Sequence, residues 1–132
     1  MKNATSEWLE FAAKDFQAAR KLSDDSDLVN IVLFHCQQTI EKSLKALLSE
    51  YAGSVPRIHS VYTLYEKLPA NIRHKLSIQI EDLEIIDSIY IDSRYPSDIG
   101  LLPSGLPTKK ELMYILDLTE TIFNTTSGFL KE

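Results

Sequence analysis

The chain has 132 residues, a length that suits one domain with a buried core. Its formal net charge of -5 argues against binding to duplex DNA or to an acidic membrane, which normally requires a basic face. No apolar run reaches the roughly 20 residues that a membrane helix needs, and residues 1–3 do not begin a secretory signal. The lone Cys36 fits a reducing cytoplasm. We therefore expect a single cytoplasmic domain over residues 1–132.

Two helices are predicted in the first part of the chain. The first runs from about Thr5 to Leu22, and its apolar side consists of Trp8, Phe11, Ala12, Phe16, Ala19 and Leu22. The second covers residues 30–51, which include neither glycine nor proline. Its apolar stripe consists of Leu33, Ile40, Leu44, Leu47, Leu48 and Tyr51. These two helices are expected to form much of the core.

Three more helices are predicted in the rest of the chain. A short one covers residues 60–68, and a long one without glycine covers residues 72–95. The long helix carries two apolar rows, which favours contact on two sides, with the core and with a second subunit. The last helix opens with a capping box formed by Thr108 and Glu111. The sequence therefore predicts an all-α, up-and-down bundle of about five helices.

A row of polar side chains lies beside the apolar stripe of residues 30–51. It consists of His35, Gln38, Glu41, Lys42 and Lys45, with a further amide at Gln37. One interpretation is the solvated back of a core helix. The other is a set of groups that serve a groove or a partner. The residue types alone leave both interpretations open.

Two further polar groups lie at helix ends. Arg57 and His59 fall in a predicted loop, and Arg94 and Tyr95 precede Pro96. Arginine suits phosphate or carboxylate, and tyrosine offers a ring for stacking. The structural alternatives are a loop-fixing hydrogen bond for His59 and a salt bridge from Arg94 to a carboxylate such as Glu41. No phosphate loop and no metal-ligand spacing are present, so no metal or cofactor is expected.

The order of these motifs resembles the HEPN family (higher eukaryotes and prokaryotes nucleotide-binding). FHCQQTIEKSLKALL, residues 34–48, is similar to its signature of an aromatic residue, a glutamine pair, Glu-Lys and a second lysine. The family then shows proline, a basic residue and histidine, as in Pro56, Arg57 and His59. Its fourth helix ends in Arg-Tyr-Pro, as at residues 94–96. AAKDFQAARKL also resembles its first helix, so the resemblance covers nearly the whole chain.

The resemblance implies a dimeric bundle of about five helices in a prokaryotic cytoplasm. Many small members are encoded beside a minimal nucleotidyltransferase and form a two-component module, often a toxin and antitoxin. It also implies a bound nucleotide or RNA end, with Lys42 and Arg94 on phosphate, Tyr95 stacking and Gln38 bonding a base or sugar. The full set of ligand-binding residues expected on this basis is Gln38, Glu41, Lys42, Lys45, His59, Arg94 and Tyr95.

Some HEPN proteins are metal-independent RNases with an arginine followed, after four to six residues, by histidine. No arginine of this chain has a histidine at that spacing, so no catalytic residue is assigned. The sequence therefore favours a protein that is not an enzyme. One alternative is an RNase with a non-standard set, such as His59 with Arg94. Another is a structural interaction module in which the same residues form a buried polar network that braces the bundle.

Overall fold

The computed structural model describes residues 1–94 and 107–131. For residues 90–94 the description covers the helical backbone and not the side chains. This part of the chain contains six α-helices, one short 3-10 helix and no strand, which confirms the predicted all-α bundle. The elements are α1 (Asn3–Leu22), η1 (Ser26–Leu28), α2 (Val29–Tyr51), α3 (Val61–Glu66), α4 (Ala70–Leu76), α5 (Ile80–Arg94) and α6 (Lys109–Leu130).

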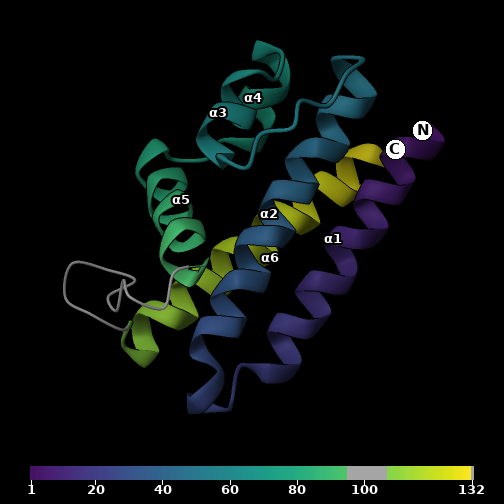
Figure 1. The fold of residues 1–132 in the computed structure, drawn as a ribbon. Coiled ribbons are helices and arrows are strands. Elements are labelled where there is room, and N and C mark those ends of the chain that lie inside the picture. Colours follow the sequence, from purple (N-terminus) through teal and green to yellow (C-terminus); the bar gives the residue numbers. More distant parts are fainter. Residues whose placement is uncertain (95–106, 132) are drawn as a thin grey trace.

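Helix α2 is the centre of the bundle. It runs antiparallel to α1 and packs on α6, while α5 and α3 contact it from another side (Figure 1). A helix contacted on so many sides buries side chains over most of its circumference. Accordingly, several of its side chains are completely buried, among them Val32, Leu33, Ile40, Leu44 and Leu47. The polar row of α2 therefore lies close to neighbouring helices, and these helices determine how much of each polar side chain is exposed to solvent.

The prediction of a single helix over residues 72–95 is wrong, because this part of the chain forms two helices, α4 and α5. Ser77 takes a left-handed conformation, with φ 52°, and its N–H donates to the carbonyl of Arg73 at 2.9 Å. The Tyr65 hydroxyl donates to the same carbonyl at 3.0 Å. The turn lets both Ile72 and Leu83 enter the core. A serine can adopt this conformation at a modest cost, so no glycine or proline marks the break.

The predicted start of the last helix is confirmed. The Glu111 N–H donates to the Thr108 hydroxyl at 3.1 Å, and the Thr108 N–H donates to Glu111 Oε1 at 2.8 Å. This reciprocal pair satisfies two amide groups that have no partner inside the helix. It fixes where α6 begins against the rest of the bundle.

Two side chains expected in the core are exposed instead. Phe11 on α1 is 54% exposed and Tyr51 at the end of α2 is 41% exposed. Tyr51 meets the ring of Phe129 edge-on, with centroids 5.4 Å apart. Phe11 lies beside the buried face of α1, which consists of Thr5, Leu9, Ala12, Phe16 and Ala19.

Candidate ligand-binding site

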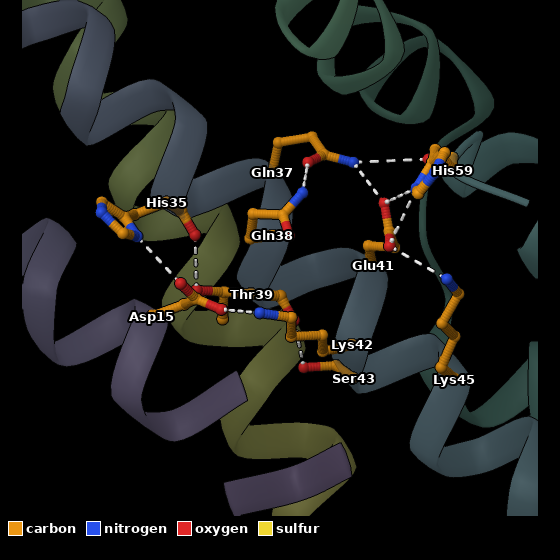
Figure 2. Close-up of polar contacts among 10 residues, drawn as sticks. All are labelled: Asp15, His35, Gln37, Gln38, Thr39, Glu41, Lys42, Ser43, Lys45 and His59. Atoms are coloured by element: carbon orange, nitrogen blue, oxygen red, sulfur yellow. Dashed lines mark hydrogen bonds and ion pairs between the residues drawn. The ribbon is translucent and has the colours of Figure 1, made fainter. Parts of the chain in front are cut away.

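The polar row of α2 is divided between two clusters, each centred on a carboxylate (Figure 2). One carboxylate belongs to Asp15 on α1, and the other belongs to Glu41 on α2. Each of them pairs with the amino group of one lysine and with Nδ1 of one histidine. The two clusters lie on neighbouring parts of α2, so one helix positions most of the candidate site.

The Asp15 cluster joins α1 to α2. Asp15 Oδ1 lies 2.8 Å from His35 Nδ1, and Asp15 Oδ2 accepts a hydrogen bond from the Lys42 amino group. The side chain of Asp15 is 13% exposed, whereas those of Lys42 and His35 are 22% and 27% exposed. Hydrogen bonds between charged groups are short and strong. The nearly buried acid therefore holds two basic groups in place while each keeps part of its surface open to solvent.

The Glu41 cluster is more deeply buried. Glu41 Oε2 accepts from the Lys45 amino group at 3.0 Å, and Glu41 Oε1 accepts from Gln37 Nε2 at 3.0 Å. The side chains of Glu41 and Lys45 are only 4% and 6% exposed. A charge so far from water is tolerated when it is paired and hydrogen-bonded, as both are here. These two residues can position their neighbours, but they present almost no surface to a ligand.

His59 connects this cluster to the surface. Its Nδ1 lies 3.3 Å from Glu41 Oε1, and its carbonyl accepts from Gln37 Nε2 at 3.3 Å. The imidazole is nevertheless 53% exposed. Gln38 extends the same chain of amides, because its Nε2 donates to Gln37 Oε1 at 2.6 Å. A buried acid thus orients an accessible imidazole, and the buried amide of Gln37 links this pair to the partly buried amide of Gln38.

The loop that carries His59 is held by a residue far along the chain. Asp87 on α5 accepts from the Ser60 hydroxyl at 2.7 Å and from the Val61 N–H at 2.7 Å. It also accepts from the Tyr62 N–H at 3.4 Å. A carboxylate at the start of a helix satisfies amides that have no partner within that helix. Asp87 therefore fixes the start of α3, immediately after His59.

Among the predicted ligand-binding residues, Glu41, Lys45 and His59 share one cluster, and Gln38 is linked to it through Gln37. Lys42 belongs to the other cluster, with Asp15. The side chain of Arg94 and the whole of Tyr95 lie outside the described residues. The interpretation of this row as a solvated helix back is wrong for Glu41 and Lys45, because both are buried against other elements. The loop-fixing hydrogen bond considered for His59 is present.

Three supporting residues were missed by the sequence analysis. Asp15, Gln37 and Asp87 provide the contacts that hold the predicted groups, yet none was assigned to the site. Gln37 was visible as one of two adjacent amides. Asp15 could have been found from the antiparallel pairing of the first two helices, which places it beside residues 35–42. Nothing in the local sequence marks Asp87.

Other reactive groups do not form a second centre in the described part of the chain. Burial raises the pKa of the Cys36 thiol to about 11, against a weaker lowering by the Thr119 hydroxyl. The thiol is therefore protonated near neutral pH and is a poor nucleophile. Within residues 1–94 and 107–131, no three acidic, histidine or cysteine side chains gather as metal ligands. The helices described there include none that is long and apolar enough to cross a membrane.

Comparison with known proteins identifies the family. The family model of the HEPN domain matches residues 5–129 of this chain. The chain belongs to the HEPN family. This HEPN domain resembles TT1696 from Thermus thermophilus, with a TM-score of 0.78 and 27% identity over 96% of this chain and 98% of that one. It also resembles ST0689, an archaeal HEPN homologue, with a TM-score of 0.67 and 26% identity over 97% and 98% of the two chains. No curated protein matches it.

Proposed function

We propose that this HEPN domain binds a nucleotide or an RNA end, as one component of a two-component module with a minimal nucleotidyltransferase, of the toxin–antitoxin type. One observation carries the binding proposal. Two basic groups, Lys42 at 22% and His59 at 53% exposure, are each held by a carboxylate that is itself largely removed from solvent. Binding sites depend on groups held in place by a supporting shell, and this arrangement supplies one.

Each residue has a distinct role in the proposed site. Lys42 binds phosphate, and Gln38 hydrogen-bonds a base or a sugar. His59 contributes an imidazole whose orientation Glu41 sets through Nδ1. Glu41 and Lys45 act from the interior as positioning residues, because their side chains are buried. Arg94 and Tyr95 complete the proposal as a phosphate contact and a stacking group.

The proposal includes a homodimer and a cytoplasmic location. Dimers are frequent in the HEPN family, to which the match over residues 5–129 assigns this chain. A dimer would bring two copies of the site into one assembly. The nucleotidyltransferase partner rests on the family resemblance of the whole chain.

Replacing Lys42 with alanine tests the site. A hydrogen bond to a charged group contributes about 1.5–3 kcal/mol, so the affinity for phosphate-bearing ligands should fall about tenfold or more. The measurement is fluorescence anisotropy of a labelled short single-stranded RNA, with ATP as a competitor. Lys21→Ala is the control, because Lys21 is an exposed lysine in the last turn of α1. Equal affinities for the wild type and Lys42→Ala would remove Lys42 from the site.

A second function is favoured by the burial of Glu41 and Lys45. In this alternative the domain is an interaction module, and the Glu41 cluster only braces the bundle. The two functions differ in one outcome of the anisotropy measurement. An interaction module binds neither RNA nor ATP in the wild-type form, whereas the proposed ligand-binding protein binds at least one of them.

A further inference from the structure

An aromatic ring stands on the surface beside the proposed site. Phe11 is 54% exposed, although it belongs to the helix that packs on α2. The amino groups of Lys14 and Lys42 lie 5.9 Å and 5.8 Å from the centre of its ring. One turn earlier, the Lys45 amino group lies 5.3 Å from the ring of Trp8. Aromatic rings and ammonium groups therefore alternate along the seam between α1 and α2.

The charges around Phe11 are paired, but unequally. Lys14 lies 3.5 Å from Glu10, and both side chains are about two-thirds exposed at 67% and 69%. Exposed pairs of this kind are weak, so the Lys14 amino group is available to another anion. Lys42 is held more firmly by Asp15. The ring thus has one movable and one fixed cation close to it, at similar distances.

We propose that Phe11 is a stacking platform for an unpaired base of single-stranded RNA, and that Lys14 and Lys42 bind the phosphates on either side of that base. This inference rests on the proposed function and deepens it by naming the ligand class and a subsite on α1. Bases stack on aromatic side chains with little dependence on sequence, while nearby cations follow the backbone. Lys42 is shared with the proposed site on α2, so the two form one surface.

A second copy of the chain is a less suitable occupant of this surface. In a two-fold dimer centred on Phe11, each ring would meet its counterpart, and Lys14 and Lys42 of both copies would be brought together. The carboxylates of Glu10 and Asp15 would be brought together as well, so a second copy would offer these amino groups no anion beyond the kind they already pair with. A nucleotide has the complementary arrangement, because its flat base suits the ring and its phosphates suit the amino groups.

The test compares binding of a labelled oligoadenylate RNA with binding of an abasic oligomer of the same ribose-phosphate backbone. Wild-type protein should bind oligoadenylate more tightly, and Phe11→Ala should weaken that binding by about 5- to 100-fold. Phe11→Tyr keeps a stacking ring and should restore the affinity. Met113→Ala is the matched control, because Met113 is 48% exposed on α6 and lies outside the site. Fluorescence of Trp8, the single tryptophan, should change on binding.

Three other outcomes would overturn the stacking platform, and one of them would overturn the proposed function as well. If the wild type binds oligoadenylate and Phe11→Ala binds it equally well, the stacking platform is wrong and the proposed function stands. If the wild type binds neither RNA nor ATP, both are wrong. If Phe11→Ala changes only the oligomeric state in size-exclusion chromatography, Phe11 belongs to a contact between copies and the inference is overturned.

Discussion

Replacing Glu41 with alanine is expected to lower the free energy of unfolding by about 3–5 kcal/mol, the usual loss when one member of a buried ion pair is removed. The reason is that Lys45, whose side chain is 6% exposed, would keep its charge in the interior without its carboxylate. Gln37 and His59 would lose the same acceptor. Urea denaturation of the two proteins measures the difference.

A double substitution separates the effect of the two charges from the effect of the volume that the side chains of Glu41 and Lys45 occupy. Glu41→Leu with Lys45→Met removes both charges and keeps apolar volume, so it should cost much less than Glu41→Ala alone. A loss below about 1 kcal/mol in Glu41→Ala would show that the Lys45 ammonium finds other solvation, because exposed pairs contribute only that much. The Glu41 cluster would then not brace the bundle.

Replacing Asp87 with alanine is expected to cost at least about 2–3 kcal/mol, because even one hydrogen bond to a charged acceptor contributes about 1.5–3 kcal/mol. The substitution removes the acceptor for Ser60, Val61 and Tyr62 at the start of α3. It should also release the loop that carries His59. Chemical denaturation gives the stability, and hydrogen exchange of the Val61 amide gives the local effect.

Asp87→Asn is the matched control for that change. An amide keeps one acceptor oxygen without the charge, so its loss should be clearly smaller than that of Asp87→Ala. If Asp87→Ala is as stable as the wild type and the Val61 amide stays protected, the carboxylate does not hold α3 in place. The position of His59 would then not depend on Asp87.

The sequence predicted those parts of the fold that depend on local patterns. The apolar periodicity of α2 and the capping box of α6 are properties of neighbouring residues, and both are confirmed. The break between α4 and α5 depends on a left-handed Ser77 and on the hydroxyl of Tyr65, in an earlier helix, bonding the Arg73 carbonyl. Neither the residue types nor their spacing around residue 77 distinguish this turn from a continuous helix.

The same distinction holds for the candidate site. The polar row was visible because its members share one helix face. Its division into two clusters was not, because Asp15 reaches Lys42 from another helix, 27 positions away along the chain. The support of the His59 loop was hidden for the same reason, because Asp87 lies 26 positions from Val61. The burial of Glu41 and Lys45, which were expected among the ligand-binding residues, was also not visible in the sequence, because it depends on the elements packed against α2.

A thermal-shift titration of the wild-type protein with ATP, with short single-stranded RNA and with buffer alone tests whether the folded HEPN domain binds a nucleotide or RNA through the surface of α1 and α2. A ligand that binds only the folded state stabilises it by about 2.7 kcal/mol at 100 times its Kd, so the Tm should rise with dose. The rise should be strongly reduced in Lys42→Ala. An unchanged Tm with both ligands, at concentrations up to the millimolar range, would contradict such binding.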